Sequence, residues 1–225
     1  MTATLDRDVT LAPIDTPRRI GTALAMVLAP WGFVVANAAY AVATGNGGSD
    51  ETGADSLALS AAHPTPLRVS TIAALLGCLL IIPATLGAMG FTRQRANRLG
   101  LIGGSLMIGG YVAYFGVVMG GFVTLAMAER GGPTGDYAAV LDAGSEAAIP
   151  FLLLFVAGNL LGTLLLGIAL LRARTVPIWA AAGICAWPVL HVTGLVAGTE
   201  WFEVAGATLQ AVGFAALAVR LARTS

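Results

Sequence analysis

Lysine is absent from this chain of 225 residues, and all 12 of its basic side chains are arginine. A chain without lysine cannot form a lysine Schiff base, so retinal pigments and related chemistry are excluded. Charge of either sign is scarce: 11% of the residues are charged, against roughly a quarter in an ordinary soluble domain. With 57% hydrophobic residues and a mean hydropathy of +0.83, the composition indicates a polytopic membrane protein.

Cysteine and histidine are almost as scarce. Cys78 and Cys185 lie in separate apolar runs without a CxxC pattern, so we expect buried small hydrophobes and no thiol-redox or zinc site. Bis-histidine haem binding needs two histidines that face each other across the bundle. The only other histidine besides His191 is His63, which lies beside Pro64 in a connection, so haem is not expected. HExxH, GxSxG and P-loop patterns are missing, as is a basic soluble domain. The sequence therefore predicts no metal, cofactor, assigned catalytic residue or nucleic-acid partner.

Long apolar runs dominate what remains. A membrane-spanning helix needs about 20 mainly apolar residues. Six segments meet this requirement: 20–44, 69–91, 101–128, 147–171, 176–198 and 202–221. The sequence predicts an all-α, six-helix transmembrane bundle over 20–222, with the lipid bilayer as its surroundings.

The arginines predict the orientation. They gather before the first apolar run, in TRQRANR (92–98), in RAR (172–174) and at the end of the chain. Only Arg68 and Arg130 fall in the other set of connections. Arginine in short loops marks the cytoplasmic side, so both termini are predicted inside. The Lys-free composition, rich in Ala, Gly and Arg, also fits a GC-rich bacterial genome, and we expect a multi-pass protein of the bacterial plasma membrane.

The polar segments are predicted to lie outside the bilayer. Residues 1–19 are expected to form a disordered cytoplasmic tail. Residues 45–67 are expected to form a mobile outer loop, and 129–146 a second one with a short surface helix capped by Asp136. The segment 36–44 also resembles a signal-cleavage site. An uncleaved first helix is favoured, because its apolar run is longer than that of a usual signal.

Glycine is abundant, with 29 residues, and it predicts how the helices pack. Close backbone contact between small residues holds membrane helices together. Four GxxxG pairs occur: Gly100/Gly104, Gly116/Gly120, Gly158/Gly162 and Gly194/Gly198. The density of glycine in 101–128 predicts a place near the centre of the bundle, although glycine is also common in membrane helices without any contact role.

Few polar side chains lie inside the apolar runs, and these are the candidate ligand-binding residues. They are Asn37, Asn159, Trp187, His191, Glu203 and Gln210. Trp187 and His191 share one helix face, because they are four residues apart. We predict that Asn37, His191 and Glu203 lie in the outer half of the bundle. His191 either faces a pocket there, paired with Glu203 or Asn37, or makes one interhelical hydrogen bond with no further role.

One stretch carries a resemblance. GTLLLGIALLRARTVPIWAAAGICAWP (162–188) has an apolar helix, an arginine turn, and a second helix opening at Pro177 and Trp179. It resembles uncharacterised six-helix integral membrane proteins of actinobacteria over roughly a tenth of the chain. The resemblance implies the fold and the membrane location, and it carries no catalytic residue to this sequence.

Three functional classes remain open. In the first, the chain binds or transports a small lipophilic molecule in the outer half of the bundle. In the second, it is an accessory or scaffold subunit of a membrane complex with a membrane-protein partner. In the third, it is an intramembrane enzyme that uses His191 as an acid–base group. The enzyme requires a second titratable group within hydrogen-bond reach of His191, and Glu203 is the candidate.

Overall fold

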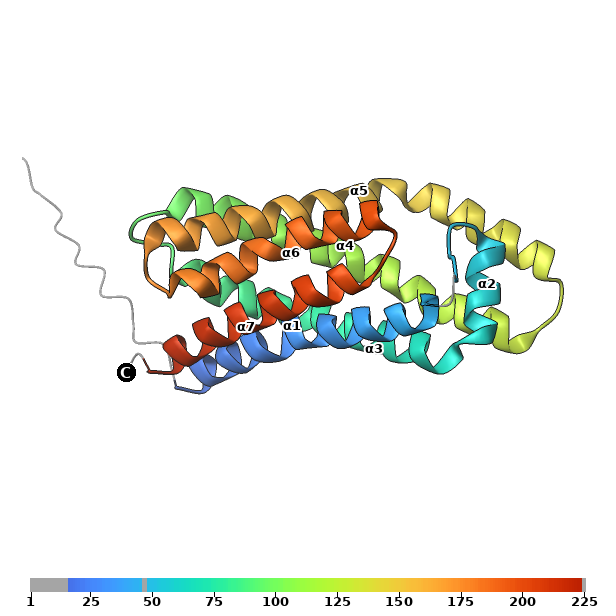
Figure 1. Cartoon of the computed structure of the whole chain (residues 1–225), viewed down its shortest axis with the longest axis horizontal. Coiled ribbons are helices and arrows are strands. Elements are labelled where there is room, and N and C mark those ends of the chain that lie inside the picture. The colour runs from blue at the N-terminus through green and yellow to red at the C-terminus, as the bar shows by residue number, and fades with distance from the viewer. Residues whose placement is uncertain (1–15, 46–47, 224–225) are drawn as a thin grey trace, which may run out of the picture.

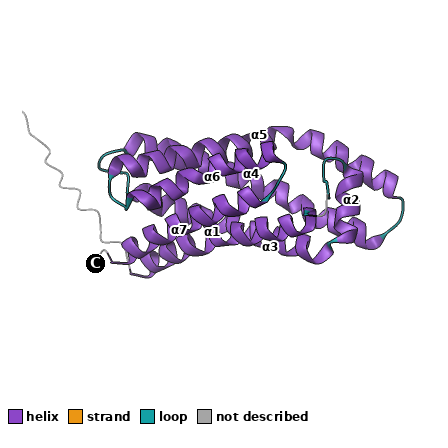
Figure 2. Ribbon diagram, in the orientation of Figure 1, coloured by secondary structure: helices purple, strands orange, loops and turns teal. Residues whose placement is uncertain are grey.

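The chain folds into helices joined by short connections. The computed structural model describes residues 16–45 and 48–223, and within these ranges the chain forms seven helices and no strand. The helices, shown in Figures 1 and 2, are α1 (Thr16–Thr44), α2 (Gly53–Ala62), α3 (Pro64–Gly90), α4 (Asn97–Arg130), α5 (Thr134–Ala173), α6 (Ile178–Ala197) and α7 (Trp201–Arg223).

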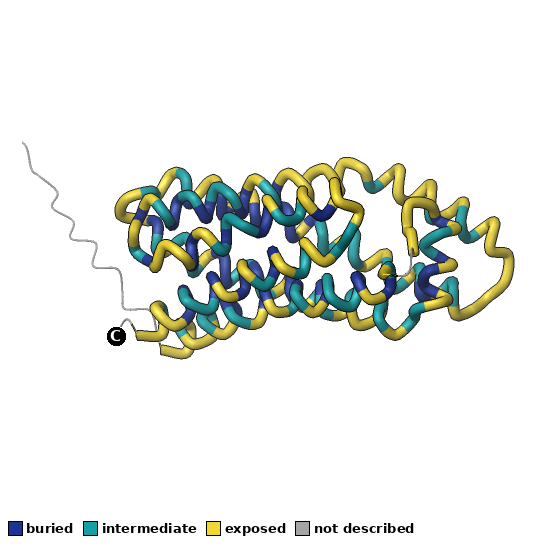
Figure 3. Tube along the Cα trace, viewed as in Figure 1, coloured by how far each residue is buried: buried dark blue, intermediate teal, exposed yellow. Residues whose placement is uncertain are grey.

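Six of these helices, all but α2, are long and apolar enough to cross a membrane. The predicted all-α bundle with six spanning segments is therefore confirmed, and the chain is a multi-pass integral membrane protein. Large apolar side chains are exposed on the outside of the bundle. Figure 3 colours the exposed positions of the chain yellow. In a bilayer this surface contacts lipid tails, so its exposure has no hydrophobic cost. Most of the tail predicted for 1–19 lies outside the described residues, and α1 already begins at Thr16.

The six long helices form a closed ring. α1 packs on α3 and α7, and the circuit continues through α3 on α4, α4 on α5, α5 on α6, and α6 on α7. The helix predicted at the centre, α4, is therefore a member of the ring. That prediction is wrong, because the glycines of α4 pack against its two ring neighbours, α3 and α5, and not around a central axis. Gly104 lies against Met89 of α3. Gly103 and Gly110 meet the α5 backbone, whereas the Cβ positions of Gly116 and Gly120 face open space.

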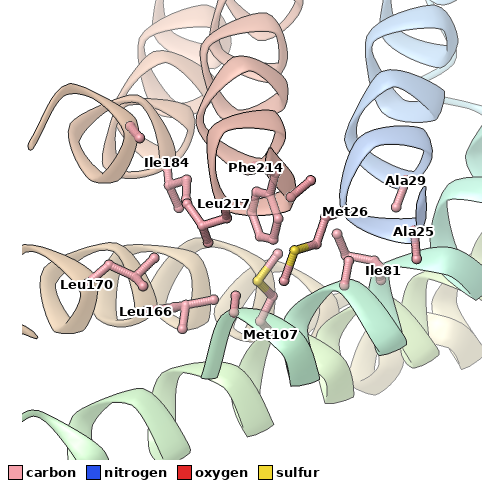
Figure 4. Close-up of a cluster of buried hydrophobic side chains, with 14 of the residues drawn as sticks. Ala25, Met26, Ala29, Ile81, Met107, Leu166, Leu170, Ile184, Phe214 and Leu217 are labelled. Atoms are coloured by element: carbon pink, nitrogen blue, oxygen red, sulfur yellow. The ribbon is translucent and has the colours of Figure 1, made fainter. Parts of the chain in front are cut away.

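The interior of the ring is solid at one end. Each of the six long helices contributes a fully buried side chain there, and Figure 4 shows them pointing toward one another. They are Met26, Ile81, Met107, Leu166, Ile184 and Phe214. The two methionines and the branched aliphatics fill this space closely, as in an ordinary protein core. All arginines of the described chain except Arg68 and Arg130 lie near this filled end, at the start of α1, the end of α7 and the α3–α4 and α5–α6 turns.

At the opposite end, α2 lies across α4 and α5. The prediction of a mobile loop over 45–67 is wrong for the described residues 48–67, where α2 and the start of α3 form although the segment is rich in Gly, Ser and Asp. The hydroxyl of Thr52 accepts a hydrogen bond from the backbone N–H of Asp55 (3.1 Å), which caps the start of α2. The backbone N–H of Gly53 donates to Oδ1 of Asp142 on α5 (2.6 Å). Local capping and burial of Leu57 and Leu59 thus fold a segment whose composition is typical of loops.

The second outer connection also differs from its prediction. Residues 134–146 do not form a separate surface helix; they are the first turns of α5, which runs unbroken for 40 residues. Asp136 lies within the first turn and is not the cap, which is Pro133. At 1.5 Å per residue, α5 measures about 60 Å, roughly twice the hydrocarbon thickness of a bilayer. The α4–α5 hairpin therefore extends beyond the membrane and supports α2.

Candidate functional site

The end of the ring under α2 is hollow. A cavity of about 480 Å³ lies there, and all seven helices contribute to its lining. The ring helices supply the walls, and α2 contributes Ser56, Leu59 and Ser60. Small-molecule sites in proteins usually have volumes of roughly 300–1,000 Å³, so this cavity has the size of a ligand site.

Three of the predicted site residues meet in this cavity. Asn37 from α1, His191 from α6 and Glu203 from α7 all line it. They come from three helices, and α7 packs between α1 and α6 in the ring. The sequence predicted their common half of the bundle, and the fold brings them to one cavity.

His191 and Glu203 form a close pair across α6 and α7. Nδ1 of His191 lies 2.9 Å from Oε1 of Glu203, and the two side chains are 14% and 12% exposed. The two atoms are within ion-pair distance, although Nδ1 makes no hydrogen bond. The aromatic plate of Trp187 lies against the imidazole, with ring centroids 5.1 Å apart. The intramembrane-enzyme hypothesis requires a second titratable group within reach of His191, and the distance to Glu203 meets this requirement.

Two buried polar atoms at the cavity have no hydrogen-bond partner in the described chain. They are Nδ2 of Asn37 and Nδ1 of His191. A buried polar group without a partner costs about 1–3 kcal/mol relative to a paired one. Such atoms on a cavity wall are the positions where water or a ligand would complete the hydrogen bonding.

Aromatic rings line another part of the cavity. Tyr114 on α4 and Phe155 on α5 are stacked, with centroids 4.1 Å apart and planes 13° from parallel, and both line the cavity. Tyr40 on α1 also lines it. Below this layer, the buried Tyr111 contacts Phe33 at 4.7 Å between centroids. The cavity thus combines flat apolar surfaces with the polar groups of α1, α6 and α7.

The other predicted residues do not line the cavity. The indole N–H of Trp187 donates to Oδ1 of Asn159 on α5 at 3.1 Å, and the Thr163 hydroxyl lies 3.4 Å from the same oxygen. Gln210 is 1% exposed, and its Nε2 atom has no partner. Trp187, Asn159 and Gln210 are buried inside the ring. The Trp187–Asn159 bond is the kind of single interhelical contact that stabilises a membrane bundle.

The predicted site set lacks several polar residues of the cavity. Tyr40, Asp50 and Glu200 all line it, together with hydroxyl side chains of α2, α3 and α4. The spacing of Glu200 and Glu203 was a usable signal, because a turn that begins a helix can direct both side chains to the same neighbour.

The lining is acidic. Asp50, Glu200 and Glu203 contribute three carboxyl groups, and none of the described residues that line the cavity is an arginine. Arg68, at the same end of the bundle, forms an ion pair with Glu129 and is not part of the lining. Burial is the largest cause that raises the pKa of Glu200, to about 7; the carboxyls of Glu203 and Asp50 contribute to the same rise, and His191 opposes it. The Glu200 carboxyl therefore gains or loses its proton near neutral pH.

Metal binding has no structural support in the part of the chain described. Over residues 16–45 and 48–223, no three His, Cys, Asp or Glu side chains are arranged to hold an ion. His191 and Glu203 form a pair, and Glu200 adds a carboxyl that faces the same space without completing a ligand set.

The cavity is what carries a functional conclusion for this membrane protein, because likeness to other proteins supplies none. Comparison of the chain with models of protein families, with curated proteins and with solved structures finds no match. The resemblance of 162–188 to six-helix actinobacterial membrane proteins stays a prediction.

Proposed function

We propose that this protein binds a small lipophilic molecule in the cavity beneath α2. The observation that carries the proposal is a hollow of about 480 Å³ inside an otherwise filled ring, lined from all seven helices. Helix packing in membranes normally removes such space, because contacts between helices are the main source of stability there. A retained hollow with polar atoms on its wall is typical of a binding site.

The lining defines the kind of molecule. Tyr114 and Phe155 offer stacked aromatic surface, and Leu59, Leu67 and Ala74 offer aliphatic surface. The free Nδ2 of Asn37 is a donor that needs an acceptor oxygen. The ligand of this proposal is therefore a mostly apolar body with a small number of polar atoms, and it reaches the cavity from the α2 end.

We also propose that the filled, arginine-rich end faces the cytoplasm of a bacterial cell, with the cavity toward the outside. The distribution of arginine supports this orientation, because positive residues are retained on the cytoplasmic side. The cavity then lies in the outer half of the bundle, within reach of molecules from outside the cell or from the outer lipid leaflet.

A scaffold role is the second candidate, and one observation favours it. The exposed stretch of α4 includes Gly109, Gly116 and Gly120, whose Cβ positions all meet open space. Small residues of this kind let a second membrane helix approach closely. A protein partner that co-purifies with the chain and is lost on Gly116→Leu would move the conclusion to this candidate.

The test of the binding proposal compares two tryptophan substitutions on α4. Val118 lines the cavity, whereas Val112 is 55% exposed on the outside of the bundle. Native mass spectrometry of the protein in mild detergent measures any small molecule that co-purifies. We expect a discrete adduct in wild type and Val112→Trp, and its loss in Val118→Trp, because the indole fills the space.

Histidine provides a second matched pair for the same measurement. His191→Ala removes a polar group from the cavity wall, whereas His63→Ala changes the only other histidine, which does not line the cavity. We expect the adduct to weaken in His191→Ala alone. A bare chain in all samples, or one that carries only bulk lipid, contradicts the binding proposal.

A further inference from the structure

The cavity gathers negative charge from distant parts of the chain. Asp50 precedes α2, Glu200 lies in the turn between α6 and α7, and Glu203 lies in the first turn of α7. The fold brings these carboxyls into one hollow, although they are up to 153 positions apart by subtraction of their numbers. Carboxyl groups repel one another at close range, so their assembly in a partly buried space needs compensation.

The described protein supplies little positive charge to compensate them. His191 is the one basic side chain of the lining, and its Nδ1 atom is already 2.9 Å from Glu203. Glu200 and Asp50 have no ion pair in the described chain. Arg68, which follows the lining residue Leu67 on α3, is engaged by Glu129. A positive charge is therefore what this cavity lacks.

The aromatic lining favours the same kind of ligand. Tyr114 and Phe155 are stacked against each other, and Tyr40 lines the cavity on α1. The faces of aromatic rings attract ammonium groups by about 0.5–2 kcal/mol, most strongly where water is excluded. Carboxylates together with aromatic faces are the combination that recognises an ammonium group attached to an apolar body.

We propose that the cavity selects lipophilic cations, such as amines or quaternary ammonium compounds, over neutral molecules of the same shape. This inference rests on the proposed binding function and adds the chemical class of the ligand. Opposite charges attract strongly in a partly buried site, since the effective dielectric constant there is far below that of water. A neutral isostere gains the apolar contacts alone.

Proton release is expected to accompany binding. Glu200, whose pKa is raised to about 7, holds a proton for half of the time near neutral pH. The titratable groups that line the cavity around it are Tyr40 of α1, Asp50 before α2, Tyr114 of α4, His191 of α6 and Glu203 of α7. A bound cation replaces the proton as the compensating charge. Affinity for a permanent cation therefore rises between pH 6 and pH 8.

The experiment uses two probes that differ in one atom. Benzyltrimethylammonium carries a permanent positive charge, and neopentylbenzene has carbon in place of its nitrogen. Equilibrium dialysis of the full-length protein in mild detergent, corrected with protein-free micelles, measures each affinity. We expect the cation to bind at least about tenfold more tightly, equivalent to about 1.4 kcal/mol, with the advantage growing from pH 6 to pH 8.

Substitutions assign the charge preference to the cavity. Glu200→Gln keeps the shape and removes the carboxylate, so we expect the cation to lose about tenfold in affinity and most of its pH dependence. Affinity for neopentylbenzene stays the same. Glu51→Gln is the matched control, because Glu51 is an exposed carboxyl at the same end that does not line the cavity.

The outcomes separate this inference from the binding proposal. Equal affinity for the two probes, abolished by Val118→Trp, overturns the preference for cations and leaves the binding function in place. A cation preference that survives Glu200→Gln and Glu203→Gln also overturns the inference. Failure of both probes to bind above the micelle background, at any pH tested, overturns the binding proposal and the inference together.

Discussion

Glu200 shows how one side chain connects the stability of this protein to pH. Its folded-state pKa is about 7, against an ordinary value of 4.5, and burial is the largest cause. The folded state therefore holds the proton more tightly than the unfolded state. The stabilisation is complete below about pH 4.5 and is lost as the pH rises toward 7. We expect the melting temperature in detergent to fall across this window through this group.

The same measurement on two variants isolates the effect. Glu200→Gln has no titrating group and should flatten this part of the profile, whereas Glu51→Gln should keep the wild-type slope. Circular dichroism at 222 nm follows unfolding without a probe that binds the protein. A Glu200→Gln profile as steep as that of wild type would mean that other groups dominate the pH dependence.

Trp187 allows the structural part of the polar interior to be separated from the cavity. Its Nε1–H bond to Asn159 joins α6 to α5 inside the ring. Trp187→Phe removes the donor and keeps an aromatic ring, so we expect a loss of about 1 kcal/mol in unfolding free energy. Trp179→Phe is the control, because Trp179 is 58% exposed and lies on the same helix. Equal unfolding free energies for the two variants would mean that the Trp187–Asn159 hydrogen bond does not stabilise the fold.

The helices α4 and α5 pack backbone against backbone. A Cβ atom on Gly158 would lie 2.6 Å from the carbonyl oxygen of Leu106, and one on Gly162 would lie 2.4 Å from the backbone nitrogen of Met107. Backbone atoms cannot give way without moving a helix. We expect Gly158→Ala and Gly162→Ala each to cost about 1–3 kcal/mol, the range for overpacked cores.

Gly116 supplies the matched control within the same helix pair. Its Cβ position is open, so Gly116→Ala adds no clash and gains up to about 1 kcal/mol from the higher helix propensity of alanine. Thermal unfolding in detergent ranks the three variants. A destabilised Gly116→Ala protein would indicate that the open face of α4 meets a second molecule in solution.

The elements also show what sequence can and cannot predict. Apolar runs long enough to cross a bilayer predicted the six spanning helices, because length and hydropathy are local properties. The helix α2 was not predicted, since it depends on a Thr52 cap and on a hydrogen bond from Gly53 to Asp142, 89 positions further along the chain. Polar residues in apolar runs led to Asn37, His191 and Glu203. Their meeting at a hollow depends on the closed ring, which no local pattern encodes.

For the whole molecule, the proposed orientation is open to a direct test. With Cys78 and Cys185 replaced by alanine, a single cysteine is introduced either at Ser49, before α2, or at Arg95, in the α3–α4 turn. A membrane-impermeant maleimide applied to intact bacterial cells should label Ser49→Cys at once and Arg95→Cys only after permeabilisation. The reverse pattern would place the arginines outside and the cavity toward the cytoplasm.

The filled end of the ring has a consequence for how a ligand comes and goes. One buried side chain from each long helix fills the interior at this end, so an occupant of the cavity has no path past this layer. These side chains are Met26, Ile81, Met107, Leu166, Ile184 and Phe214. For the occupant to pass this layer of buried side chains, the six long helices would have to move apart. The proposed ligand would then enter and leave at the α2 end alone, and the occupied fraction of the protein would follow the ligand concentration at that face of the membrane.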